Sequence, residues 1–376
     1  MLKKKSNKKL RLAIIGGGLR STIGKAHFIA IKESSKFEIC FGCFSREKKI
    51  NYKSGKAYEL KNNQIYNNWK IMIKENFSKI DAVLILLPTP QHFSVLNFII
   101  KCNLPVICEK PLVTSRYQAQ KLIDQTKKSK IFIGTTYNYP GFPLLREMFY
   151  QIKSNKIGKI NNFIFEMHQD SLVRLRKKIK KWRLIDKFIP TIISDLGSHL
   201  FFLTKLFFEK KPLKLLSSFH KSKKIKNIVA EAKILLKYKN DLNGLLLISK
   251  NSIGQRNDLK LRVYGEKGSL IWSIKKPEIL EVYKNNGNMY LLDRGSKNLI
   301  GNYKNYSNYS PGHPLGFVEA FSNLYKDLGT SLNNYLNNKP FKNQFLFDHH
   351  DALDVANFFE AASISNKKNK WITLKK

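Results

Sequence analysis

The chain has 376 residues, of which 43% are apolar, and its formal net charge is +41. This length predicts about two domains, and the apolar fraction excludes a chain that is disordered throughout. The four cysteines are too few for a disulfide framework, and no apolar run approaches the roughly 20 residues that cross a membrane. We therefore expect a soluble cytoplasmic protein with no membrane partner.

The positive charge has two interpretations. Clustered basic residues are typical of proteins that bind nucleic acid or anionic membranes. Here the lysines are scattered along the whole chain, and no helix-turn-helix or zinc-finger pattern accompanies them. A general drift toward Lys, Asn and Ile explains the same composition. We favour this second interpretation, which predicts no specific nucleic-acid partner and only a raised affinity for anionic ligands.

The first 140 or so residues alternate strands and helices, as in a parallel sheet covered by helices. An apolar strand at 12–15 leads through a glycine-rich turn at 16–24 into a helix at 25–31. The other expected strands are 37–44, 81–87, 106–108 and 131–133, and the other expected helices are 91–101 and 114–127. Strand 81–87 is apolar on both faces after its first residue, which is typical of a central parallel strand.

The second part of the chain is rich in strands that alternate polar and apolar residues. A helix is expected at 144–153, with a strand starting near 160 and others at 230–238, 245–249, 259–264, 269–272 and 279–283. Late helices are expected at 317–336 and 349–363. The pattern predicts a Rossmann-type, doubly wound α/β domain over 1–143. An α+β domain with an open, mainly antiparallel sheet follows over 144–376, and its C-terminal segment can pack back on the first domain.

The glycine turn predicts a dinucleotide site. Gly16, Gly18 and Gly24 lie between a strand and a helix, where backbone can approach a pyrophosphate. Their spacing of one and five residues departs from the usual one and two. Ser45 and Arg46 follow the second strand, where NAD-binding proteins usually carry an acid. A hydroxyl and a guanidinium suit a 2′-phosphate better, so we lean slightly to NADP over NAD; the alternative is a solvated arginine.

Two further segments lie after predicted parallel strands, at the edge where such sheets bind ligands. Pro88 and Thr89 can line a nicotinamide ribose, or Thr89 can be a helix N-cap with Pro90 at the first helical position. Lys110, in the triplet Glu109-Lys110-Pro111, places an amine at the same edge. No metal site is expected, because Cys40 and Cys43 would point to opposite faces of a strand.

A carboxylate and an imidazole lie four residues apart, at Asp195 and His199. On a helix this spacing places both on one face. Asp195 could then orient the imidazole and raise its pKa. His199 would accept a hydroxyl proton while hydride leaves the same carbon, and Lys110 would stabilise the developing charge on that oxygen. The alternative is an exposed Asp–His pair.

These motifs together resemble the Gfo/Idh/MocA family of nicotinamide-dependent oxidoreductases. Glu109-Lys110-Pro111 is similar to the family's E-K-P signature, and Asp195, Gly197 and His199 match its D-x-G-x-H segment. Other matching segments, spread over nearly the whole chain, are Pro88–Thr89 with His92, Gly24 with His27, 137–139, 182–183, 263–268 and 313–314.

The resemblance implies that Lys110, Asp195 and His199 are catalytic, with NAD or NADP as cofactor. His27, His92 and Glu109 join the expected cofactor site. It also implies a sugar, sugar nucleotide or cyclitol as substrate, and a homo-oligomer, either dimer or tetramer. Aromatic rings and polar groups suit a sugar, so the candidate substrate residues are Tyr137, Asn138, Tyr139, His168, Trp182, Arg183 and His313. For two of them there is a structural alternative: Tyr139 as core, and Arg183 as the partner of Asp186.

Two other functions stay open. Some proteins of this kind resemble glycosidases that hold NAD and cleave the glycosidic bond through oxidation and elimination. The net charge of +41 also permits a nucleic-acid-binding or sensory protein on a dehydrogenase fold. The complete set of Lys110, Asp195 and His199 argues against this last possibility.

Overall fold

The computed structural model describes residues 8–127, 129–174, 181–208, 211–301, 305–307 and 309–374. These residues form two compact units, and neither is continuous in sequence. The first takes in residues up to Val113, together with Tyr117–Gly141 and Phe317–Ala352. The second takes in Thr114–Arg116, Phe142–Gly316 and the chain from Leu353 onward. Each unit has its own sheet and its own core.

The first unit is built on a five-stranded parallel sheet with the strand order β2-β1-β3-β4-β5. An isolated parallel bridge between Gly42 and Ile65 extends the sheet beyond β2. With this bridge as a rudimentary outer strand, the order is that of the Rossmann fold, so the predicted fold class is confirmed. The strands are β1 (Leu10–Gly16), β2 (Phe37–Cys43), β3 (Ala82–Leu86), β4 (Val106–Cys108) and β5 (Ile133–Thr135).

Some helices of this unit differ from those expected. The regular helix α4 begins at His92, because Thr89–Gln91 forms a separate 3₁₀ turn. The N-cap of that turn is Pro88, so the prediction of Thr89 as N-cap was wrong. Two further helices, α2 and α3, were not predicted. The helices of the N-terminal part are α1 (Gly24–Ser34), α2 (Lys48–Ala57), α3 (Trp69–Asn76), α4 (His92–Lys101) and α5 (Arg116–Thr126).

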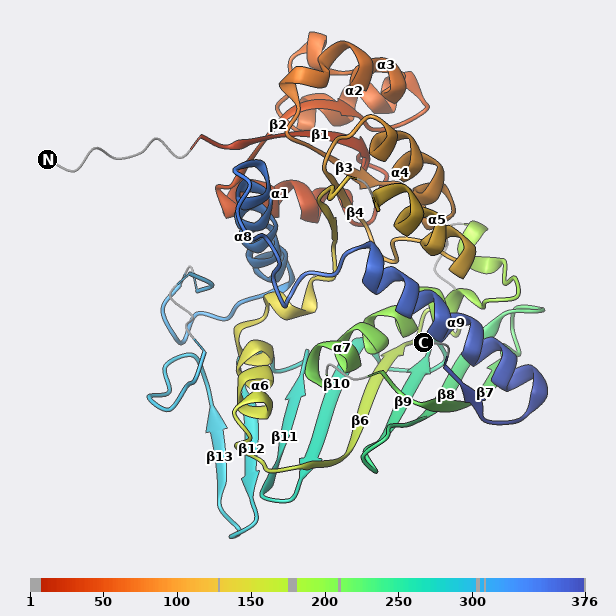
Figure 1. Ribbon diagram of the computed structural model, residues 1–376, viewed down its shortest axis with the longest axis vertical. Helices are drawn as coiled ribbons and strands as arrows, with labels where there is room; N and C mark the ends of the chain where they lie inside the picture. The colour runs from red at the N-terminus through yellow and green to blue at the C-terminus, as the bar shows by residue number, and fades with distance from the viewer. Residues whose placement is uncertain are drawn as a thin grey trace, which may run out of the picture. The chain divides into compact units, whose positions relative to one another are not determined.

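A helix from late in the chain completes the core of the first unit. The helix α8 (Phe317–Leu336) lies along α1 (Figure 1). Its buried residues Tyr325 and Leu328 pack in one cluster with Leu12 and Ile14 of β1. Apolar side chains at helical spacing on α8 therefore cover apolar side chains of the sheet, and burial of both faces stabilises the unit.

The second unit contains a nine-stranded sheet, with the order β13-β12-β11-β10-β6-β9-β8-β7-β14. Its one parallel pair joins β6 to β9; the remaining pairs are antiparallel. The predicted mainly antiparallel sheet is thus confirmed. The strands are β6 (Ile160–Gln169), β7 (Lys214–Lys221), β8 (Val229–Lys237), β9 (Asn243–Ser249), β10 (Arg256–Gly265), β11 (Gly268–Ser273), β12 (Leu280–Lys284), β13 (Met289–Leu292) and β14 (Ile372–Thr373).

Helices cover one face of this sheet (Figure 1). Along β6, Phe163, Phe165 and Met167 are buried while the residues between them are half-buried, as period-two alternation requires. Phe163 and Phe165 pack against aromatic rings of α7. The covering helices are α6 (Pro143–Lys153), α7 (Ser198–Phe208) and α9 (His349–Lys368). None of the helices in the described parts of the chain is long and apolar enough to cross a membrane.

Candidate active site

The first unit gathers its candidate residues at one edge of the sheet. The glycine turn, Ser45, Pro88, Glu109-Lys110 and Thr136 follow β1, β2, β3, β4 and β5 respectively. Because the five strands are parallel, their carboxyl ends lie along the same edge. The chain also reverses its direction of progress through the sheet between β1 and β3, which is where sheets of this class bind ligands.

The glycine turn fits a pyrophosphate. Gly16 and Gly17 have φ values of +88° and +70°, a backbone region that residues with a Cβ rarely adopt. A Cβ added to Gly24 would lie 1.8 Å from the carbonyl oxygen of Gly17, so the strand and α1 approach too closely for any side chain. The N-terminus of α1 can stabilise an anion brought to this turn. This region can therefore hold the phosphates of a dinucleotide.

The unusual length of this turn has a local explanation. The N–H of Ser21 donates to the carbonyl of Gly18 at 2.6 Å, which closes a tight turn between Gly18 and Gly24. The hydroxyl of Ser21 then accepts from the N–H of Gly24 at 3.2 Å. The extra residues thus form a capped turn before α1. On the other side of the turn, the hydroxyl of Tyr58 donates to the carbonyl of Gly17 at 2.7 Å.

Ser45 and Arg46 lie after β2, as predicted. The N–H of Glu47 donates to the hydroxyl of Ser45 at 3.2 Å, and the side chain of Arg46 is exposed. Neighbouring Arg20 forms an exposed ion pair with Glu47 at 2.6 Å. Two guanidinium groups thus lie near the end of β2, and only that of Arg20 has a carboxylate partner among the described residues.

Glu109 is held by a hydrogen-bonded chain inside the first unit. His27 is fully buried; its Nδ1 lies 2.7 Å from the hydroxyl of Tyr325, and its Nε2 lies 3.1 Å from Oε1 of Glu109. The hydroxyl of Thr136 donates to the same carboxylate oxygen. The Nε2–H of His27 can donate to Glu109, while its Nδ1 either accepts from or donates to the hydroxyl of Tyr325. Three segments, namely α1, α8 and the chain after β5, therefore fix the residue that precedes Lys110.

The charge state of Glu109 follows from these contacts. Burial acts most strongly and by itself would raise the pKa of Glu109. The hydrogen bond and charge of His27, together with the charge of Lys110 and the hydroxyl of Thr136, outweigh burial and lower this pKa below its ordinary value. Glu109 is thus a carboxylate at neutral pH, and its negative charge lies next to the half-buried Lys110.

His92 links two strand ends. Its Nε2 lies 2.9 Å from the carbonyl of Leu87 and its Nδ1 lies 3.0 Å from the carbonyl of Pro111. The ring is fully buried, and burial is the main reason why its pKa is lowered. His92 therefore joins the segment after β3 to the segment that carries Lys110. The bond between Lys110 and Pro111 is cis.

Three candidate substrate residues follow β5. Tyr137, Asn138 and Tyr139 are all buried, and the ring of Tyr137 packs edge-on against Phe347. The Nδ2 of Asn138 is buried and has no hydrogen-bond partner among the described residues. A buried amide in this condition is costly unless a ligand or water pairs with it, so Asn138 is the strongest binding candidate of the three.

The second unit supplies Asp195 and His199. Residues Ile193–Gly197 form one π-helical turn, which continues into α7 at Ser198. The prediction of regular α-helical spacing between the two residues was wrong, because π-helical pairing widens the turn that holds Asp195. Both side chains are nonetheless on one short segment, and both residues are more than nine-tenths buried. Single π-helical turns inside helices are frequent at functional sites.

Two cations bind the carboxylate of Asp195. The Nη1 of Arg183 donates to its Oδ2, and the Nζ of Lys250 lies 3.0 Å from the same oxygen. Arg183 thus pairs with Asp195 and not with Asp186, whose carboxylate instead accepts the backbone N–H groups of Thr191 and Val229 at 2.7 Å each. Sequence reasoning missed Lys250, because no motif surrounds it and its partner lies 55 residues away.

The remaining candidates of the second unit have different environments. The guanidinium of Arg183 lies over the ring of Trp182, 4.8 Å from its centroid, and the buried Nε1 of Trp182 has no partner among the described residues. His168 is on β6 next to buried Met167, so it lies on the sheet face that α7 does not cover. There its Nδ1 lies 2.9 Å from the hydroxyl of Ser252.

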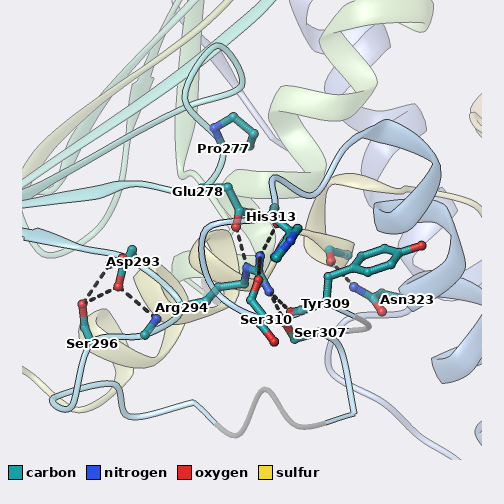
Figure 2. Close-up of polar contacts among 12 residues, drawn as sticks. Pro277, Glu278, Asp293, Arg294, Ser296, Ser307, Tyr309, Ser310, His313 and Asn323 are labelled. Atoms are coloured by element: carbon teal, nitrogen blue, oxygen red, sulfur yellow. Dashed lines mark hydrogen bonds and ion pairs between the residues drawn. The ribbon is translucent and has the colours of Figure 1, made fainter.

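His313 belongs to a loop that is organised by Arg294. The buried guanidinium of Arg294 pairs with Glu278 and donates to the carbonyls of Tyr309 and His313 (Figure 2). The side chain of His313 is exposed, so the structure fixes its backbone and not its imidazole. Within the described ranges, no group of three or more His, Cys, Asp or Glu side chains could hold a metal ion.

Two stretches of the chain match the models of one oxidoreductase family. Residues 10–137 match the model described as "Oxidoreductase family, NAD-binding Rossmann fold", and residues 150–374 match the one described as "Oxidoreductase family, C-terminal alpha/beta domain". The uncharacterized oxidoreductase YfiI of Bacillus subtilis is 26% identical over 334 residues, which cover 85% of this chain and 84% of that protein. The family description names NAD and gives no support to the lean toward NADP.

Solved structures share the fold. An inositol dehydrogenase homolog of Azotobacter vinelandii, complexed with NADH and myo-inositol, superposes with a TM-score of 0.88 at 22% identity. The alignment covers 97% of this chain and 98% of that one. A levoglucosan dehydrogenase complexed with NADH and levoglucosan gives a TM-score of 0.83 at 17% identity, with 98% and 100% covered.

Proposed function

Because the chain belongs to the Gfo/Idh/MocA family of NAD-binding oxidoreductases, we propose that it transfers a hydride between a nicotinamide cofactor and a carbon that carries a hydroxyl or keto group in a sugar, sugar nucleotide or cyclitol. The main support is the carboxyl edge of the first sheet. There a glycine turn that admits no side chain lies on the same edge as Lys110, which follows the anchored carboxylate of Glu109. The inositol and levoglucosan ligands of the structural neighbours support the substrate class.

In the proposed site, Gly16, Gly18 and Gly24 hold the pyrophosphate, and Pro88 and Thr89 lie along the nicotinamide end. When bound, the cofactor accepts or returns the hydride. NAD is the cofactor that the family description supports. His27, His92 and Glu109, which the sequence predicts to bind the cofactor, are also proposed to support Lys110. Their hydrogen bonds hold the strand ends in place around Lys110.

The proton chemistry is assigned to side chains of this chain. His199 takes the proton of the substrate hydroxyl as general base, and Asp195 orients the imidazole. Lys110 stabilises the charge that develops on the same oxygen. The unpaired donors of Asn138 and Trp182 are proposed to bind substrate hydroxyls, since each needs an acceptor. Tyr137, Tyr139, Arg183, His168 and His313 remain predicted substrate residues.

The test compares Lys110→Ala with wild type and with Lys101→Ala, which removes an exposed lysine at the end of α4. Reduction of NAD is followed with myo-inositol, levoglucosan and other polyols, and the Kd for NADH is measured by fluorescence. We expect Lys110→Ala to lose about 100-fold or more in kcat and to keep the wild-type Kd. Wild-type turnover in this variant would contradict the assignment.

The same assay separates the glycosidase alternative. Release of sugar from glycosides in the presence of NAD, without net formation of NADH, would show that the enzyme cleaves the glycosidic bond by oxidation and elimination. A homo-oligomer is also part of the proposal, and light scattering of the purified protein tests it. A mass equal to the monomer's 43.7 kDa at micromolar concentration would contradict it.

A further inference from the structure

Lys250 is a buried cation outside every motif of the chain. It follows β9 directly and is 7% exposed. Its N–H donates to the carbonyl of Ala230 at 2.8 Å, and its carbonyl accepts from the N–H of Leu172 at 3.0 Å. Backbone bonds on both sides thus fix the point from which the side chain extends, so its direction is set by the sheet.

That direction leads to the π-helical turn. Two residues earlier, near the end of β9, the Cδ1 of Ile248 lies 3.3 Å from where a Cβ of Gly197 would be. Residues two apart on a strand share a face, so Lys250 also faces this turn. Its Nζ lies 3.0 Å from Oδ2 of Asp195. The ion pair between Lys250 and Asp195 is therefore set by the position of Lys250 at the end of β9.

The electrostatics of this contact bear on His199. A buried ammonium is costly unless it is paired, and here both Lys250 and Arg183 bind one carboxylate. Two positive charges and one negative charge leave this cluster with an excess of one positive charge. Asp195 and His199 lie about one turn apart on the same segment. The imidazole therefore experiences a carboxylate whose negative charge is largely offset.

We propose that Lys250 is a positioning residue of the dehydrogenase site that acts through Asp195. It fixes the carboxylate and offsets its charge, so that His199 remains neutral and able to accept a proton from the substrate. This inference rests on the function proposed above. It also amends the expectation from sequence, in which Asp195 alone favours the charged imidazole.

The first measurement does not depend on turnover. NMR of histidine-labelled protein follows the imidazole signals against pH, and the signal lost in His199→Gln identifies His199. In Lys250→Met, we expect His199 to titrate about 0.5–1 pH unit higher than in wild type, because a positive charge has left its neighbourhood. Lys205→Met is the matched control. Lys205 is on α7, the helix that carries His199, and it forms a partly buried ion pair with Asp354 of α9. It should leave the titration unchanged.

The second measurement uses catalysis. Lys250→Met should lower kcat about 10-fold at neutral pH and move the pH profile of kcat/KM to higher pH, with the Kd for NADH unchanged. Lys250→Arg should recover most of the rate. If Lys250→Met does not fold, Lys250→Gln keeps a hydrogen-bond donor without the charge. An unchanged His199 titration in the folded variant overturns the inference. A wild-type protein without any turnover counts against the proposed function, and the titration still decides the role of Lys250.

Discussion

At the scale of single residues, Arg46 provides a test of cofactor preference. Its exposed guanidinium follows β2, at the position that contacts the adenosine ribose in folds of this kind. We expect Arg46→Ala to leave the Kd for NADH unchanged and to weaken NADPH about 10-fold, because Arg pairs a phosphate bidentately. Fluorescence titration with both cofactors measures this. An equal effect on the two would show that Arg46 does not contact a 2′-phosphate.

Asp81 gives a pH dependence of stability. Its carboxylate accepts two hydrogen bonds from the side chain of Arg11 and one from the backbone of Arg11. Burial, the largest influence, raises the pKa of Asp81, but these bonds outweigh it and lower the pKa. A lowered folded pKa means that the stabilisation is present above the unfolded pKa of about 3.9 and is lost as pH falls through the folded value.

Asp81→Asn should therefore lower the free energy of unfolding by about 1–2 kcal/mol at pH 7, where the charged hydrogen bonds are lost. The difference from wild type should shrink as the pH falls below 4. Urea unfolding at several pH values tests this, with Asp124→Asn as control. The carboxylate of Asp124 is exposed, and its partners among the described residues are Gln120 on the same helix and Lys127 just after it. A difference that is independent of pH would contradict the argument.

Residues at this scale also show what sequence can predict. Lys110, Asp195 and His199 could be predicted as catalytic candidates because short motifs surround them. Lys250 and Tyr325 could not be predicted, since each acts through a partner that is 55 or 298 residues away in the chain. A single sequence carries no information on such pairs. Arg183 was found, but its partner was not, because a nearby Asp186 offered an equally plausible pairing.

At the scale of elements, α8 anchors the residue that precedes Lys110. The hydroxyl of Tyr325 is hydrogen-bonded to His27, and His27 is hydrogen-bonded in turn to the carboxylate of Glu109. Tyr325→Phe leaves the Nδ1 of His27 without this partner, and we expect a loss of about 1–2 kcal/mol in stability and a several-fold loss in kcat. Tyr335→Phe, on the same helix, is the control; it should leave kcat unchanged. Equal kcat values in the two variants would show that Tyr325 does not support the active site.

Whether an element was predicted depended on its apolar pattern. The strand β3 is buried throughout, and its uninterrupted apolar run was clear. The helix α2 was missed because its buried residues are Asn51, Ser54 and Gly55, which give no apolar period. Two of them make polar contacts instead: the hydroxyl of Ser54 accepts from the N–H of Leu19 in the glycine turn, and the side-chain oxygen of Asn51 accepts from the N–H of Phe44 just after β2.

At the scale of the whole molecule, the charge of +41 predicts weak, general attraction to polyanions. We expect the protein to bind duplex DNA of any sequence at low salt and to lose this binding steeply between about 50 and 200 mM salt. Fluorescence anisotropy with two unrelated duplexes, at several salt concentrations, measures it. Preference for one sequence that persists at high salt would instead favour the nucleic-acid-binding alternative.

The discontinuity of the first unit has a consequence for its synthesis. The sheet is complete once residue 135 has been made, but α8, which covers its core, begins at residue 317. At about 5–20 residues per second, the ribosome needs roughly ten to forty seconds for the intervening segment. During that interval the apolar side chains destined for α8 have no covering helix. Until α8 is made, the exposed apolar surface of the nascent sheet favours aggregation, which chaperones counteract.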